Sequence, residues 1–152
     1  MAEHQYVVFL LNKEEFGLNI DTVHEIVQPR KIVKLPQSSE LIEGIINLRG
    51  AIIPIVDLKK RFYGTSTERL ETTRFVIVEV GEWKVGIIVD VVSEVQNFSE
   101  KQIAILPPFI QHVSVGSGLK GVGKLNDRLV ILLDLALIFS SEEMNLIEEV
   151  TS

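Results

Sequence analysis

Short blocks of hydrophobic residues, separated by polar and turn-forming residues, run along most of the chain. Many blocks are rich in Val and Ile, whose branched side chains favour strands over helices. Short blocks bounded by Gly, Pro, Asn and Asp are typical of a β-sandwich or β-barrel. The pattern therefore predicts an all-β fold. The expected strands are residues 5–11, 15–20, 25–28, 44–48, 51–56, 74–80, 84–89, 92–96, 121–125 and 128–133.

The C-terminal residues depart from this pattern. Ser140 followed by Glu143 is a capping-box sequence, in which each residue's side chain bonds the other's backbone N–H at the start of a helix. Apolar residues then recur at every third position within 142–150, which indicates one helical face. We expect a short closing helix here and shorter helical turns at 38–43 and 57–62.

Two segments of the first half resemble two segments of the second half, in the same order. Residues 16–26 align with 85–95 at an offset of 69, sharing a Gly, an Asp, a Val and a Glu. Residues 44–58 align with 121–135 at an offset of 77, keeping a Gly, two Leu and an Asp. Coincidence is the alternative, because Gly, Val and Asp recur in any β protein. Duplication predicts two small β-barrels built alike, packed together, with a groove between them as a natural binding site.

Composition limits the classes of protein to consider. The chain has 152 residues, 46% of them hydrophobic, which suits one domain spanning residues 1–152 and made of two small subdomains. The absence of cysteine excludes disulfides, thiolate metal sites and cysteine nucleophiles. No apolar stretch approaches the roughly 20 residues of a membrane-spanning helix. The polar N-terminus lacks the pattern of a signal peptide. We therefore expect a cytoplasmic protein without membrane insertion.

Charge is unevenly distributed. The formal net charge is −6, which argues against nucleic acid as a partner. Residues 28–61 carry seven basic and three acidic side chains, a local charge of +4, so the rest of the chain totals −10. Such a basic band suits a protein partner with acidic spots, and the alternative is a solvated face that only maintains solubility.

Three sequence patterns resemble chemical motifs but lack essential parts. Residues 118–125 nearly spell a phosphate-binding loop, but a leucine replaces the magnesium-ligating Ser or Thr and a strand-like run follows. His24 begins a pattern close to a zinc-protease helix, but Gln28 replaces the second histidine. Asp57 and Asp134 occupy equivalent places in the repeat, where a strand gives way to a helical turn and aspartate usually caps. We expect no enzyme activity, no metal and no cofactor.

The segment 44–58 is the most specific part of the chain. Arg49 and Gly50 form a tight turn between two apolar strands, and Gly50 can supply the positive φ that such a turn needs. Pro54 cannot donate to a strand ladder, so the second strand is expected at an edge or bulged there. Arg49 would be a forked donor for a partner's carboxylate or carbonyl group, or else an ordinary solvated turn residue.

This turn, with the strand after it ending in Pro-Ile-Val-Asp-Leu, resembles the signature of the CheW-like family. Phe16-Gly17 and Val85-Gly86 match the same family, and the resemblance runs from about residue 5 to residue 147. It implies two intertwined five-stranded β-barrels and a non-catalytic chemotaxis adaptor. The implied partners are the regulatory domain of the histidine kinase CheA and the cytoplasmic hairpin tip of a chemoreceptor, held in the groove between the barrels.

The resemblance also implies binding residues. The positions that match the family's receptor groove are Val23, Glu25, Gly44, Arg49, Phe75, Gly86, Val92 and Val95. Several of these are expected in the core instead, especially Val92 and the two glycines, whose loss would mainly distort packing. The positions most expected at the surface are Val23, Glu25 and Arg49. Phe109, in a proline-containing loop, corresponds to a second contact with the kinase.

The sequence alone is also compatible with three other functions. An adaptor of the same fold could serve another chemosensory pathway, controlling pili or gene expression. A small-molecule-binding β-barrel is a second alternative, although the apolar strands bring few polar residues together. An enzyme is the third, and the sequence lacks a coherent set of nucleophile, base and metal ligands.

Overall fold

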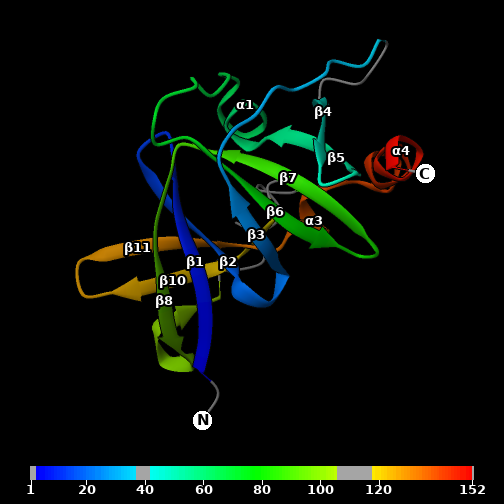
Figure 1. Cartoon of the computed structure of the whole chain (residues 1–152). Helices are drawn as coiled ribbons and strands as arrows, with labels where there is room; N and C mark the ends of the chain where they lie inside the picture. Colours follow the sequence, from blue (N-terminus) through cyan, green and yellow to red (C-terminus); the bar gives the residue numbers. More distant parts are fainter. Residues whose placement is uncertain (1–2, 37–41, 106–117, 152) are drawn as a thin grey trace.

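The computed structural model describes residues 3–36, 42–105 and 118–151, which form two β-sheets and a C-terminal helix (Figure 1). The first sheet has the strand order β8-β1-β2-β11-β10-β9 and the second the order β3-β6-β7-β5-β4. The strands of the first sheet are β1 (Glu3–Leu11), β2 (Glu14–Asn19), β8 (Val91–Ser99), β9 (Ile103–Ala104), β10 (Leu119–Leu125) and β11 (Arg128–Leu133). Those of the second are β3 (Val23–Val27), β4 (Ile42–Leu48), β5 (Ala51–Asp57), β6 (Arg74–Val80) and β7 (Trp83–Val89). The helices are η1 (Ile20–Thr22), α1 (Leu58–Tyr63), η2 (Glu100–Gln102), α3 (Leu135–Ile138) and α4 (Ser141–Thr151).

The chain crosses between the two sheets twice. It leaves the first sheet after β2, and β3 pairs with β6 of the second sheet. It returns after β7, and β8 pairs with β1 of the first sheet. Each sheet therefore contains strands from both halves of the chain, which makes the two halves intertwined as the family resemblance implies.

The internal repeat predicted from the sequence is present in the strand register. Gly17 lies opposite Val8 and, across a parallel pairing, opposite Leu132. Gly86 lies opposite Ile77 and, across the equivalent parallel pairing, opposite Ile55. These partners differ by the same offsets, 69 and 77, that relate the two halves of the sequence. The bulges also recur, between Ile42 and Gly44 in β4 and between Leu119 and Gly121 in β10.

Buried side chains form three clusters. One cluster belongs to the first sheet and includes Tyr6 and Phe98, and another belongs to the second sheet and includes Phe75. The largest cluster contains residues of both sheets and Ile147 of α4. Because this shared cluster lies against both sheets, each half of the molecule depends on the other for the burial of its apolar residues.

The predicted caps are confirmed. The carboxylate of Asp57 accepts hydrogen bonds from the backbone N–H groups of Lys59 (3.1 Å) and Lys60 (3.3 Å) at the start of α1. Asp134 accepts from the N–H of Ala136 (3.0 Å) at the start of α3. Ser140 and Glu143 form the reciprocal bonds of the capping box before α4.

The all-β class and the C-terminal helix are confirmed, and each predicted strand is present. The expectation of five-stranded barrels needs correction. The first sheet has six strands, counting the two-residue β9, and within the described residues neither sheet closes its ends by a continuous ladder. In the second sheet only the isolated pairing of Val33 with Ile45 links the chain after β3 to β4. Pro29 and Pro36 flank this segment, and proline cannot donate to a ladder. The expected turn at 38–43 lies largely outside the described residues.

No helix within the described parts of the chain is long and apolar enough to span a membrane.

Candidate functional site

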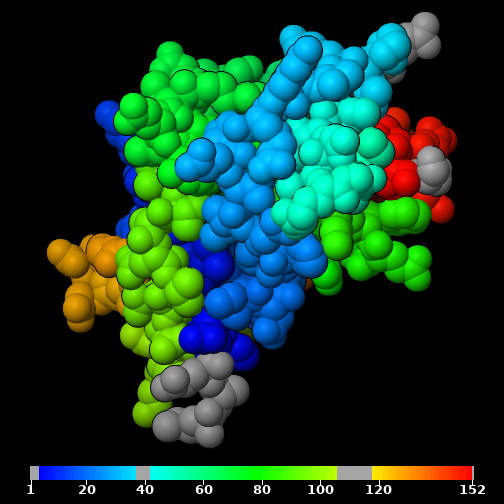
Figure 2. All heavy atoms as spheres, in the orientation of Figure 1, coloured from blue at the N-terminus to red at the C-terminus, as the bar shows by residue number. Residues whose placement is uncertain are grey.

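The strands β3 and β8 lie at the ends of their sheets and carry four of the predicted groove residues. Figure 2 shows β8 and β3 on either side of a depression, with atoms of β1 visible between them. An edge strand presents unpaired backbone groups and one row of side chains to a partner. We call this surface, made by residues Val23–Val27 of β3 and Val92–Val95 of β8, the inter-sheet groove.

Aliphatic side chains occupy matching places on the two strands. Val23 and Val92 are half-buried and pack against the shared core cluster. Val95 lies opposite Val7, on the same face of its sheet, and is 52% exposed. Ile26 is the repeat equivalent of Val95 and is 40% exposed. Half-buried and exposed aliphatic residues side by side are typical of a surface that is completed by an apolar partner.

Ile26 was not among the sequence-predicted groove residues. The signal that could have found it is the offset of 69, which maps Val95 onto position 26. Period-2 alternation alone does not find it, because a bulge between Val23 and Glu25 shifts the register of β3 against β6.

Arg49 and Glu25 form an ion pair beside the groove. Arg49 and Gly50 connect β4 to β5 with positive φ at both residues (51° and 88°), as a two-residue hairpin turn requires. Asn47 Oδ1 accepts a hydrogen bond from the N–H of Gly50 (2.8 Å), which fixes the turn. Arg49 Nη2 donates to Glu25 Oε2. This hydrogen bond is the main reason that the pKa of Glu25 lies below its ordinary value. Arg49 remains 67% exposed, so the pair presents a polar rim to solvent.

Three of the predicted groove residues are buried instead. Phe75 is fully buried within the second sheet, with the guanidinium of Arg69 5.3 Å from the centre of its ring. Gly86 is buried where a β-carbon would collide with Ile55, and Gly44 where one would collide with Ile32 and the backbone of Val33. Phe75 is buried and the two glycines have no side chain, so the three influence the groove through the packing of the sheet beneath it.

The predicted kinase contact, Phe109, lies outside the described residues.

The first sheet has its own charged cluster at the position equivalent to the ion pair. Glu94, the repeat equivalent of Glu25, accepts a hydrogen bond from Arg128 Nη2 (2.8 Å). Arg128 Nε also donates to Glu15 (3.1 Å). In each sheet, an arginine from a β-hairpin thus bonds the glutamate of an end strand.

The segments that resemble a phosphate-binding loop and a zinc-protease helix take other conformations. Residues Leu119–Leu125 form strand β10 rather than a loop that opens a helix, and His24 lies in strand β3. In the described parts of the chain, no group of three or more His, Cys, Asp or Glu side chains could hold a metal ion. The groove is a surface of apolar contacts with a charged rim, which can bind a protein segment.

Comparison with known proteins identifies the family. The CheW-like domain matches residues 5–143. The chain is 35% identical to the chemotaxis protein CheW of Klebsiella aerogenes over 96% of this chain and 87% of that protein. It is 34% identical to the chemotaxis protein CheW of Treponema pallidum over 93% and 85%. A solved structure of the scaffolding protein TtCheW from Thermoanaerobacter tengcongensis superposes with a TM-score of 0.80, at 38% identity over 94% and 92% of the two chains. On this similarity and on its fold, the chain belongs to the CheW-like domain family.

Proposed function

We propose that the protein is a non-catalytic adaptor of chemotaxis that couples a chemoreceptor to the histidine kinase CheA in the cytoplasm. The observation that carries this proposal is the inter-sheet groove, where the end strands β3 and β8 present matching aliphatic residues beside a charged rim. The names of the relatives, chemotaxis proteins and a scaffolding protein, support the same function.

The groove suits the tip of a helical hairpin. A helix presents an apolar stripe at the spacing i, i+3, i+4 and i+7, which can lie along a shallow apolar groove. Covering Val95 and Ile26 would stabilise the complex by up to about 1.5–3 kcal/mol for each fully buried side chain. The Arg49–Glu25 pair would contribute orientation at the rim rather than much affinity.

The kinase would bind a different surface, because an adaptor has to hold both partners at once. The resemblance implies a kinase contact at Phe109, and this assignment stays a prediction. Coupling also requires that the adaptor binds the active and inactive states of the kinase with different affinity, since equal affinity would shift neither population.

The test is binding of a receptor hairpin fragment and of the kinase regulatory domain, measured separately for the full chain. Wild type should bind both. Val95→Asp and Ile26→Asp should each lose the receptor fragment and keep the kinase domain, because a charge in the groove opposes apolar burial. Leu129→Asp is the matched control, since Leu129 is 63% exposed on β11, outside the groove.

Two results would contradict the proposal at different levels. A folded wild-type protein that binds neither partner would exclude the coupling function. A folded Val95→Asp variant that keeps full affinity for the receptor would exclude the groove assignment while leaving the adaptor function possible.

A further inference from the structure

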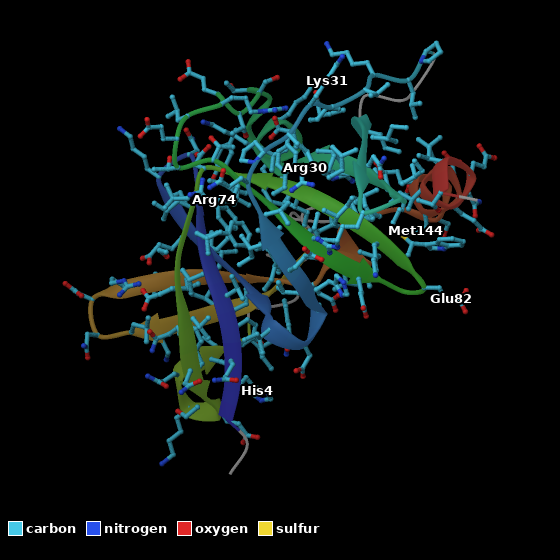
Figure 3. The ribbon with its side chains drawn as sticks, viewed as in Figure 1. His4, Arg30, Lys31, Arg74, Glu82 and Met144 are labelled. Atoms are coloured by element: carbon cyan, nitrogen blue, oxygen red, sulfur yellow. The ribbon has the colours of Figure 1, made fainter. Side chains whose placement is uncertain are left out.

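A basic depression lies where β3 ends and β6 begins. It has a volume of about 600 Å³ and is lined by the residues that follow β3 and those that precede β6. Four of its lining residues are cations, Arg30, Lys31, Arg69 and Arg74, and one is a carboxylate, Glu71. Figure 3 shows Arg30, Lys31 and Arg74 at the same end of the molecule. None of the predicted groove residues lines this depression.

The four cations have no carboxylate partner within the described residues. The ion pairs there engage Arg49, Lys59, Lys60, Arg61 and Arg128, together with His24. The depression thus concentrates positive charge on a protein whose net charge is −6. Like charges gathered on one surface repel one another, and an anionic partner relieves this repulsion.

Two of the cations are held in place by the fold. Arg74 Nη1 donates to the backbone carbonyl oxygens of Glu71 and Thr73, each at 2.7 Å. Arg69 is placed over the ring of the buried Phe75. Cations that are already positioned lose less side-chain freedom when a partner binds, which favours affinity.

The rim of the depression is apolar as well as charged. Leu70 is 62% exposed between Arg69 and Glu71. A site for a small inorganic anion gains nothing from such a residue, whereas a peptide can place an apolar side chain on it. Guanidinium groups also match the geometry of carboxylates through paired hydrogen bonds.

We propose that the basic depression is a docking site for an acidic segment of a protein partner, with an apolar residue between its carboxylates. The site is separate from the inter-sheet groove, and the inference does not depend on receptor or kinase binding. The net negative charge of the protein argues against nucleic acid as the ligand.

The test uses NMR titration of the full chain with the synthetic peptide Gly-Glu-Glu-Leu-Glu-Glu-Gly at low ionic strength. We expect saturable shifts at the residues lining the depression, weakened by added salt. Arg30→Gln with Lys31→Gln should reduce the affinity about tenfold, equivalent to the loss of a few charge-assisted contacts. The double variant Lys13→Gln with Lys124→Gln is the matched control, because it removes the same charge from exposed turn and strand positions elsewhere.

Four outcomes would overturn the proposal. The first two are the absence of saturable binding to wild type and an equal loss of peptide affinity in the two double variants. The third is equal binding of a peptide with Gln at every Glu. The fourth is displacement of the peptide by pyrophosphate at the same concentration as by unlabelled peptide. The last result would make the depression a small-anion site. Urea unfolding of both variants confirms that a loss of binding is not a loss of fold.

Discussion

Arg49 donates a hydrogen bond to Glu25 across the gap between β3 and β4, which are not neighbours in the second sheet. Glu25 lies in β3 at one end of the second sheet, and Arg49 lies in the turn beside β4 at the other end. The ion pair therefore links the two ends of the sheet and stands beside the inter-sheet groove.

The ionisation of Glu25 should depend on this link. Replacing Arg49 with Gln is expected to raise the pKa of Glu25, because the hydrogen bond from Arg49 is the main cause of its lowering. In wild type the pKa of Glu25 is lower in the folded state than in the unfolded state. The pair therefore stabilises the fold at pH values above the ordinary glutamate pKa. That contribution is lost as pH falls through the lowered value. NMR titration of the Glu25 carboxyl measures the shift.

Lys84→Gln is the control for this titration, because Lys84 has the smallest influence on the Glu25 pKa. An unchanged Glu25 pKa in Arg49→Gln would show that the pair does not form in solution.

Gly86 and Gly17 occupy equivalent places but have different room for a side chain. A β-carbon at Gly86 would collide with Ile55 Cδ1, whereas one at Gly17 would lie 3.1 Å from Leu132 Cδ2. Gly86→Ala is therefore expected to lower the free energy of unfolding by about 1–3 kcal/mol, the usual cost of overpacking. Gly17→Ala should cost less than half as much, as measured by urea denaturation. An equal or larger cost at Gly17 would contradict the crowding at Gly86.

Phe75 should behave as a core residue. Phe75→Ala is expected to lower the free energy of unfolding by about 3–5 kcal/mol, because it leaves a cavity in the second sheet. Any loss of receptor binding in this variant should follow the fraction of unfolded protein. Val95→Ala is the comparison, with a change in unfolding free energy within about 0.5 kcal/mol because the side chain is largely exposed. A fully stable Phe75→Ala that fails to bind the receptor would make Phe75 a direct contact.

Arg61 should hold the C-terminal helix in place. Its guanidinium donates to both carboxylate oxygens of Glu143 (2.6 and 3.0 Å) and to the carbonyl of Ile138 (2.8 Å). Arg61→Ala is expected to increase amide hydrogen exchange in α4, at a cost of roughly 1–2 kcal/mol for charge-assisted bonds at a partly buried site. Exchange in β6 should change little, and serves as the internal control. Unchanged exchange in α4 would show that apolar packing around Ile147 is sufficient.

The same contact predicts a pH dependence. Burial by itself raises the pKa of Glu143, but the hydrogen bonds from Arg61 and Ser140 outweigh it, and the net pKa lies below the ordinary value. Docking of α4 should therefore be fully stable above the ordinary glutamate pKa and weaken as pH falls through the lowered value. Arg61→Ala should lose most of this dependence. Hydrogen exchange in α4 across this pH range measures it.

The sequence predicts the strands and the internal repeat well, because each strand pattern is local and recurs in the second half of the chain. The offsets of 69 and 77 are enough to place Gly17 and Gly86 in equivalent pairings, and the strand registers agree with them. Caps such as Asp57 are predictable for a similar reason, since the helix N–H groups that they cap lie within three positions along the chain.

Burial at the candidate site is less predictable. Phe75 and Val95 both occupy strand positions that match the family's groove, yet one is fully buried and the other is 52% exposed. A one-residue bulge reverses which side chains face the core, and the sequence does not reveal where the bulge falls. The helical turn after Asp134 is more predictable, because the repeat aligns Asp134 with Asp57 and each aspartate caps the helix that follows it.

The return of the chain to the first sheet at β8 has a consequence for synthesis of the protein. The N-terminal hairpin of β1 and β2 is made first, but its neighbours in the sheet are β8 and β11. Both edges of this hairpin therefore stay unpaired on the ribosome until residues 91–133 have emerged. The pairings that complete the fold join residues distant in sequence, so folding should be slow for a chain of this length. During that interval the exposed hairpin edges, rich in Val and Phe, are the part of the nascent chain that most needs protection from pairing with other chains.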